Sequence, residues 1–281
     1  NESCKLADTS WIKPGTVMRE TTISTPECLK MIDYCASMGI SYMILDWGWY
    51  GLANSHKSDP SIVNVTNPAT GQPIPRHPGL DLPKVINYGK EKGVGVLLWL
   101  TWLTVEKHFD LFKTFSEWGI SGIKIDFMDR SDQWMVNFYE RVVKAAAENH
   151  LVIDFHGAFK PAGLERRYPN LLSYEGVRGM EYMGNCIPEN SLYFPFIRNA
   201  VGPMDYTPGA MISMQPESYK AERPNAASIG TRAYQLALYV VFESAIQMLA
   251  DNPTLYYRNQ DCTEFITSVP VTWDKTEVLD A

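Results

Sequence analysis

The sequence lacks a long uncharged apolar run, an excess of basic residues and the composition of a disordered or fibrous chain. No run reaches the ~20 apolar residues that a membrane-spanning helix needs, so we expect no membrane span. Lys and Arg number 25 against 32 Asp and Glu, which gives a net charge of −7 and leaves no broad basic surface for nucleic acid. Of the 281 residues, 45% are hydrophobic and 20% charged, as is typical of a globular domain. Neutral or cationic ligands are therefore the expected partners.

Cysteine is also sparse, and its spacing indicates no framework. The five cysteines include no C-x-x-C pair and no Cys/His zinc spacing. We therefore expect no disulfide bond and five small buried thiols, at Cys4, Cys28, Cys35, Cys186 and Cys262. The motifs of a P-loop, a zinc protease and an α/β-hydrolase are missing as well. Most histidines are expected in loops or on helix surfaces, namely His56, His77, His108 and His150.

Short β-rich apolar runs alternate with amphipathic segments along the chain. The runs cover residues 41–46, 93–102, 122–127 and 151–156, with a weaker run at 171–175. Helices are predicted over 25–38, 82–92, 105–118 and 132–149, and the first three end at a glycine. Continuous apolar strands are typical of a parallel sheet. This rhythm predicts the α/β class and a single (β/α)8 TIM barrel over residues 1–281, with an open doubly wound sheet as the alternative.

Two polar segments interrupt the rhythm. Residues 51–79 and 215–225 are rich in Pro, Asn or Ser and lack periodicity, so we expect long loops there. Loops of this kind usually shape the active site of a barrel. A late helix followed by a last strand is expected over residues 228–249, and irregular chain beyond Asn252.

Several apolar runs end in a polar residue: Asp46, Asp126, His156 and Glu175. In a barrel the carboxyl ends of the strands meet at one mouth, where the chemistry lies. A carboxylate buried there without a partner would cost several kcal/mol, so each should face the mouth or a partner. One such residue alone would more often be structural. Four together favour a functional site.

Lys124 and Asp126 lie two residues apart on one predicted strand, so both side chains point to the same side. If that side is the lumen, the ammonium group would keep Asp126 ionised and bind a substrate hydroxyl. Three interpretations remain open at this point. Asp126 is a nucleophile at the anomeric carbon of a sugar, or Lys124 forms a Schiff base as in barrel aldolases, or the two are a buried ion pair of the core.

Glu175 and Glu181 flank a segment with two glycines, which indicates a tight loop. Both carboxylates could then reach one point, as a general acid or as oxygen ligands for Ca²⁺. The alternative is a pair of solvated glutamates with Arg178 as a surface partner. The 8 Trp and 15 Tyr provide flat apolar faces that suit sugar rings, or that simply pack a core.

These motifs together resemble the catalytic barrel of glycoside hydrolase family 97. The matching stretches keep the family order over nearly the whole chain, at residues 8–14, 45–49, 122–129, 154–156, 160–163, 175–181 and 202–208. Family members also have an N-terminal β-sandwich and a C-terminal β-domain, and we expect neither in this chain. It starts at Asn1 with neither Met nor a signal peptide, so we expect an excised catalytic domain. The resemblance implies a periplasmic or secreted location.

The resemblance also implies a stereochemical class. Retaining members have an aspartate nucleophile in a K-x-D motif, here Asp126, and an acid/base in the last glutamate of E-G-x-R-G-M-E, here Glu181. Inverting members lack that aspartate and have a base glutamate at the position of Gly157. Both features imply a retaining, exo-acting enzyme that cleaves terminal α-galactosides. We then expect the carboxyl groups of Asp126 and Glu181 to lie roughly 5–5.5 Å apart.

The resemblance further implies that Asp46, Trp47, Lys124 and His156 bind the sugar of an oligosaccharide or glycoside. Glu175 and Glu181 match two ligands of a family Ca²⁺ site, and another ligand comes from the β-sandwich. Ca²⁺ is therefore expected in the full-length enzyme and only weakly in this chain. The alternatives within the family are an α-glucosidase and a β-L-arabinopyranosidase. A Schiff-base aldolase using Lys124 and a non-catalytic sugar-binding barrel are the alternatives outside it.

Overall fold

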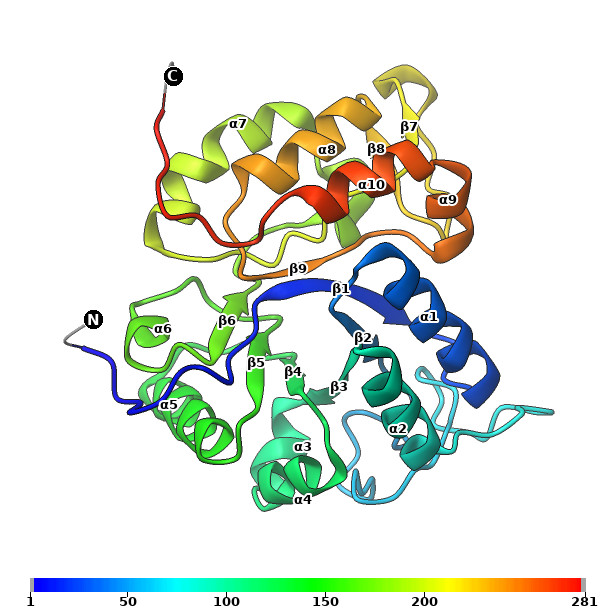
Figure 1. Ribbon diagram of the computed structural model, residues 1–281, viewed down its shortest axis with the longest axis vertical. Helices are drawn as coiled ribbons and strands as arrows, with labels where there is room; N and C mark the ends of the chain where they lie inside the picture. Colours follow the sequence, from blue (N-terminus) through cyan, green and yellow to red (C-terminus); the bar gives the residue numbers. More distant parts are fainter. Residues whose placement is uncertain (1–2, 279–281) are drawn as a thin grey trace.

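The computed structural model describes residues 3–278, so the chain start at Asn1 lies outside the described part. Its main sheet has seven parallel strands in the order β6-β5-β4-β3-β2-β1-β9, which curve into a barrel (Figure 1). The strands are β1 (Gly15–Glu20), β2 (Tyr42–Leu45), β3 (Gly95–Thr101), β4 (Gly122–Asp126), β5 (Val152–Phe155), β6 (Leu171–Tyr174) and β9 (Ile246–Met248). A second sheet pairs β7 (Ile212–Met214) with β8 (Ala227–Ile229).

An extended segment, residues 203–208, occupies the remaining position of the barrel, between β6 and β9. The Asp205 amide donates to the Tyr174 carbonyl at 2.7 Å, and the Met204 amide donates to the Glu243 carbonyl at 2.8 Å. Past the end of β9, the Ala250 amide donates to Pro208 at 3.0 Å. The predicted eight-position barrel is therefore confirmed, but one position is bridged by single hydrogen bonds rather than by a regular ladder.

Arg198 fastens this irregular position to β6. Its side chain is buried, at 5% exposure, and no carboxylate pairs with it among the ion pairs of residues 3–278. Instead its guanidinium donates to five backbone carbonyls at 2.9–3.1 Å, those of Tyr174, Glu175, Gly176, Gly202 and Pro203. Because backbone carbonyls buried without a donor are costly, this side chain supplements the few backbone hydrogen bonds at this position.

We expect Arg198→Met to lower the free energy of unfolding by roughly 3 kcal/mol, because several buried carbonyls would lose a charged donor at once. Urea unfolding followed by fluorescence would measure the change. Arg141→Met is the matched control, because Arg141 makes a half-exposed ion pair with Glu106 and should cost less than about 1 kcal/mol. Equal midpoints for the two variants would contradict the role given to Arg198.

Helices cover the outside of the barrel (Figure 1). Three predicted helices are confirmed within one residue, and two of them end at left-handed glycines, Gly39 and Gly93. The helix predicted over 105–118 is two helices with a break at 108–110. The helices are α1 (Thr25–Met38), α2 (Leu82–Lys92), α3 (Trp102–Lys107), α4 (Leu111–Trp118), α5 (Gln133–Glu148), α6 (Leu164–Arg167), α7 (Pro188–Ile197), α8 (Arg232–Val241), α9 (Pro253–Arg258) and α10 (Gln260–Ser268).

The irregular chain expected beyond Asn252 is a wrong prediction, since α9 and α10 follow it. Asn252 caps α9 by accepting a hydrogen bond from the Leu255 amide, and Pro253 stands at the start of the helix. In Figure 1, α7, α8 and α10 lie together on the β9 side of the barrel. None of the described helices is long and apolar enough to cross a membrane.

All five cysteines are free thiols, as the spacing predicted. Four of them are buried, but Cys4 is only half-buried, so the expectation that all five are core residues is wrong at that position.

Candidate active site

The polar residues that end the strands line one cavity at the carboxyl end of the barrel. Its volume of about 690 Å³ lies within the roughly 300–1,000 Å³ typical of small-molecule sites. The structure brings six of the predicted site residues together around it, namely Asp46, Trp47, Asp126, His156, Glu175 and Glu181. Their chemical roles remain predictions, but their convergence is a property of the fold.

Asp126 is held as a carboxylate at the end of β4. One carboxylate oxygen, Oδ2, accepts a hydrogen bond from Trp99 Nε1 at 2.8 Å and lies 3.2 Å from His156 Nδ1. The other, Oδ1, accepts from the Phe127 amide at 2.5 Å, and Phe127 has a positive φ of 60°, which is uncommon for a residue other than glycine. Burial opposes ionisation, but the hydrogen bonds and the charges of His156 and Lys124 outweigh it and lower the pKa of Asp126.

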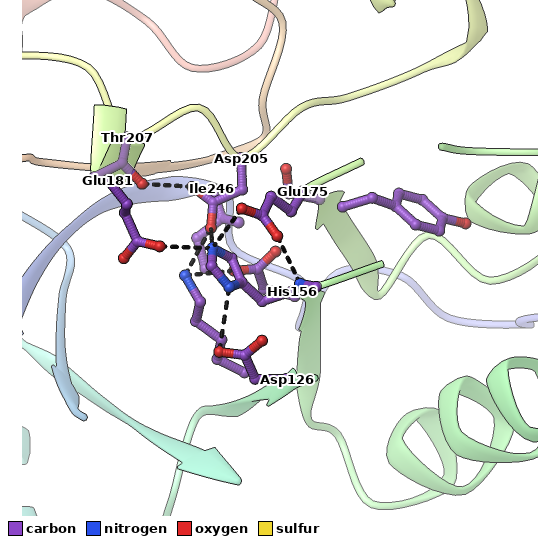
Figure 2. Close-up of polar contacts among 12 residues, drawn as sticks. Asp126, His156, Glu175, Glu181, Asp205, Thr207 and Ile246 are labelled. Atoms are coloured by element: carbon purple, nitrogen blue, oxygen red, sulfur yellow. Dashed lines mark hydrogen bonds and ion pairs between the residues drawn. The ribbon is translucent and has the colours of Figure 1, made fainter. Parts of the chain in front are cut away.

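His156 lies at the centre of four carboxylates (Figure 2). Its Nδ1 faces Asp126, and its Nε2 lies 3.6–3.8 Å from one oxygen each of Glu175, Glu181 and Asp205. Burial and the charge of Lys124 lower its pKa, but Asp126 and Asp205 raise it further, to about 10. His156 is therefore an imidazolium at neutral pH, and it separates Asp126 from the two glutamates.

Lys124 does not lie free beside Asp126 as the sequence predicted. Its Nζ lies 2.7 Å from Asp205 and 3.5 Å from Asp154, and its side chain is only 9% exposed. Burial lowers the pKa of Lys124, but these two aspartates raise it more, so the amine stays protonated. Burial and the charge of Asp205 raise the pKa of Asp154. The predicted ion pair between Lys124 and Asp126 is therefore wrong in its partner: Lys124 pairs with Asp205, and Asp126 is contacted by Trp99 and His156 instead.

Glu175 and Glu181 converge, as the loop glycines predicted, but a different hydrogen-bond donor holds each carboxylate. Glu175 Oε2 accepts from the Gly157 amide at 2.7 Å, and burial raises the pKa of Glu175. Glu181 lies in a 3₁₀ segment, η1 (Met180–Asn185), and its Oε1 accepts from Arg19 Nη1 at 2.7 Å. The suggested surface partner, Arg178, instead stacks over the ring of Tyr182 at 5.2 Å.

Trp47 forms an aromatic wall of the cavity. The residue is 37% exposed, and its ring stacks on Trp99 at 5.7 Å, with 12° between the planes. Phe127 packs edge-on against both rings. A partly exposed, rigidly backed indole is the kind of surface on which a sugar ring packs.

Sequence reasoning missed Arg19, Trp99 and Asp205. Arg19 also contacts Asp46, with its Nε 3.2 Å from Oδ2. It follows a run of only four weakly apolar residues, so β1 itself was not predicted. Asp205 lies in the irregular segment, where no strand pattern marks it. Trp99 points toward Asp126 from β3, but it lies in a continuous apolar run that does not mark which of its residues face the mouth.

The described residues do not by themselves fit a Ca²⁺ ion. His156, Glu175 and Glu181 each place one ligand atom within 4.8 Å of the others. Ca²⁺ usually takes six to eight oxygen ligands, and this group has two carboxylates and an imidazolium. The guanidinium of Arg19 already binds one oxygen of Glu181. Further oxygen ligands would have to come from elsewhere.

We therefore expect the 281-residue chain to bind Ca²⁺ weakly, with a dissociation constant above ~1 mM. Isothermal titration calorimetry in chelator-treated buffer would measure it. The Glu175→Gln variant is the comparison, because a true site should lose its remaining heat when that carboxylate is removed. Micromolar binding to the unaltered chain would contradict this ligand count.

Comparison with known proteins identifies clear relatives. The model of the family described as glycoside hydrolase 97 matches residues 10–177. A retaining alpha-galactosidase of Bacteroides thetaiotaomicron is 38% identical over 98% of this chain and 42% of its own length. A probable retaining alpha-galactosidase of Streptomyces bingchenggensis is 34% identical over 98% of this chain and 41% of its own. The chain thus spans about two fifths of these curated relatives.

Solved structures agree on the fold. A glycoside hydrolase family 97 enzyme from Pseudoalteromonas sp. strain K8, in complex with acarbose, is 27% identical, with a TM-score of 0.82 over 100% of this chain and 47% of that chain. A beta-arabinopyranosidase is 21% identical, with a TM-score of 0.72 over 97% of this chain and 44% of that chain, a similarity of fold alone.

Proposed function

Since this chain belongs to glycoside hydrolase family 97, we propose that it is the catalytic barrel of a retaining, exo-acting enzyme that cleaves terminal α-galactosides. The observation that carries the proposal is the fixed carboxylate of Asp126. It lies on the cavity at a strand end, with Trp99 and the Phe127 amide as hydrogen-bond donors and the His156 cation beside it. A carboxylate held in one orientation and kept ionised is suited to act as a nucleophile.

The reaction would take two steps. In the first, Glu181 gives a proton to the leaving oxygen while Asp126 attacks the anomeric carbon, and a glycosyl ester forms on Asp126. In the second, Glu181 takes a proton from water, the water oxygen bonds to the anomeric carbon, and Asp126 leaves as a carboxylate. Asp46, Trp47 and the His156 cation would hold the sugar from the cavity wall. Lys124 would act indirectly, because its ion pair with Asp205 holds that carboxylate near the imidazolium of His156.

The backbone at Gly157 supports retention over inversion. The family resemblance implies that inverting members carry their base glutamate at the position of Gly157. Gly157 has a φ of 57°, and a Cβ there would come within 3.0 Å of the Phe127 amide nitrogen and 3.1 Å of Asp126 Oδ1. A side chain at this point would therefore collide with the turn that orients Asp126. The absence of a side chain at Gly157 is therefore linked to the position of the Asp126 carboxylate.

The galactose preference of the proposal rests on the two curated relatives, which are named as retaining or probable retaining alpha-galactosidases. An α-glucosidase or a β-L-arabinopyranosidase remains the alternative. A Schiff-base aldolase has little support, because a nucleophilic lysine must lose its proton and the aspartates around Lys124 oppose that loss. Calcium belongs to the proposal only with oxygen ligands from outside residues 3–278. A periplasmic or secreted location likewise remains a prediction.

Hydrolysis of a panel of aryl glycosides by the full-length protein tests the proposal, with NMR of the first-formed product. We expect aryl α-galactosides to react fastest and to release the α anomer first. The β anomer would contradict retention. Faster release from an aryl α-glucoside or β-L-arabinopyranoside would select an alternative within the family. Binding of galactose without turnover of any glycoside would indicate a sugar-binding barrel instead.

A further inference from the structure

Arg19 lies at the mouth of the barrel and contacts two predicted site residues, Asp46 and Glu181. It stands near the end of β1 and lines the same cavity as Asp126. Its Nη1 donates to Glu181 Oε1 at 2.7 Å, while its Nε lies 3.2 Å from Asp46 Oδ2. The guanidinium is planar and carries its donors in a fixed fork, so two contacts through different nitrogens fix its orientation.

Glu181 needs such an external support. It lies in η1, which is broken by a non-helical residue, Met183, with a φ of 47° and a ψ of −110°. Its side chain is 37% exposed, so packing does not restrict its rotamers. A second arginine, Arg223, donates from its Nη2 to the Glu181 carbonyl at 3.2 Å. The acid/base candidate is therefore held at its carboxylate by Arg19 and at its backbone by Arg223.

The contact with Arg19 also decides which oxygen of Glu181 remains available. Oε1 is occupied by the guanidinium. Oε2 lies 3.7 Å from His156 Nε2, which is beyond hydrogen-bond distance, and Glu181 lines the cavity. The oxygen that transfers the proton would then be Oε2.

We propose that Arg19 is a positioning residue, which aims Glu181 Oε2 at the anomeric centre by holding Oε1. This inference rests on the proposed function. It matters most in the second step, where the water oxygen bonds to the anomeric carbon, the bond from that carbon to Asp126 breaks with its electron pair returning to the carboxylate, and the water proton passes to Oε2. Water needs a correctly placed base for this attack. A preformed anion such as azide does not.

The test uses this difference, on 2,4-dinitrophenyl α-galactoside, whose leaving group needs no acid. We expect Arg19→Met in the full-length protein to lower kcat about 10- to 100-fold, because a misplaced base costs this much, and to lower KM as the glycosyl-enzyme accumulates. Sodium azide should restore kcat and give α-galactosyl azide, with the anomer of the substrate. Arg19→Lys should keep part of the activity, since an ammonium group can hold one carboxylate.

Arg141→Met is the control, because Arg141 bonds Glu106 at 2.8 Å with a similar exposure but lies outside the cavity lining. It should behave as the unaltered enzyme and show no response to azide. A raised KM with an unchanged kcat and no azide effect in Arg19→Met would mean that Arg19 binds the sugar directly, and would overturn the inference alone. An unaltered enzyme that turns over no aryl α-galactoside would overturn the proposed function, and this inference with it.

Discussion

Replacing Asp126 by glycine is expected to reduce turnover of activated aryl α-galactosides by roughly 10⁴-fold or more, because no covalent intermediate can form without the nucleophile. Azide should restore part of the rate by entering the space left by the carboxylate. It would attack the anomeric carbon from the side that Asp126 occupies, so the product would be β-galactosyl azide, with the opposite anomer to the substrate. NMR of the azide product and a rate assay with a dinitrophenyl galactoside measure both effects.

The exposed residue Asp129 provides the control, three positions further along the same turn. Asp129→Gly should keep the activity of the unaltered enzyme and make no azide product. Activity that survives in Asp126→Gly but disappears in Asp129→Gly would transfer the nucleophile role to Asp129. Loss in both variants would call for a check of folding, which urea unfolding supplies.

Replacing Glu181 by alanine should produce the second-largest effect, and one that depends on the leaving group. For substrates with poor leaving groups, such as an α-galactoside of a sugar, we expect kcat/KM to fall roughly 10²- to 10⁴-fold, which is the usual contribution of a general acid. For a dinitrophenyl galactoside, kcat/KM should change little, because that leaving group departs without a proton. Azide should raise kcat and give the α-galactosyl product.

Glu106→Ala is the matched control for this variant, since Glu106 also pairs with an arginine at 2.8 Å but does not line the cavity. It should show neither the leaving-group dependence nor the response to azide. If Glu181→Ala lowers kcat/KM equally for good and poor leaving groups, Glu181 is not the acid. Glu175, the other glutamate near His156, would then be the candidate.

Local signals predicted most of the barrel. The strands from β2 to β5 lie in short, mostly apolar runs bounded by turn residues, and a glycine ends each of α1, α2 and α4. β1 was not predicted because its apolar run is short and is followed directly by Arg19 and Glu20. Its strand character depends on the neighbouring strands, β2 and β9, which sequence patterns do not encode. The segment 203–208 was not predicted either, because its conformation depends on contacts with distant residues, namely those with Arg198 and a few isolated backbone hydrogen bonds.

The candidate site divides in the same way. Asp46, Asp126, His156 and Glu175 were predictable because each follows an apolar run. The contacts between side chains were not, since they join residues far apart in the chain. Arg19 and Glu181 are 162 residues apart, and Lys124 and Asp205 are 81 apart. The sequence therefore predicted which residues gather at the mouth, but it did not predict the ion pairs that they form.

The pairing of β1 with β9 has a consequence for synthesis of the protein. Gly15, Thr16 and Val17 pair with Ile246, Gln247 and Met248, so the first strand of this sheet in chain order, β1, cannot complete its pairing until the last, β9, has been synthesised. A nascent chain that has emerged only as far as β6 is an open parallel sheet with two unpaired edges, β1 and β6. Exposed edges of this kind recruit other chains and favour aggregation. The risk should therefore be greatest while α7 and α8 are being translated, and a pause or a chaperone would help most in that interval.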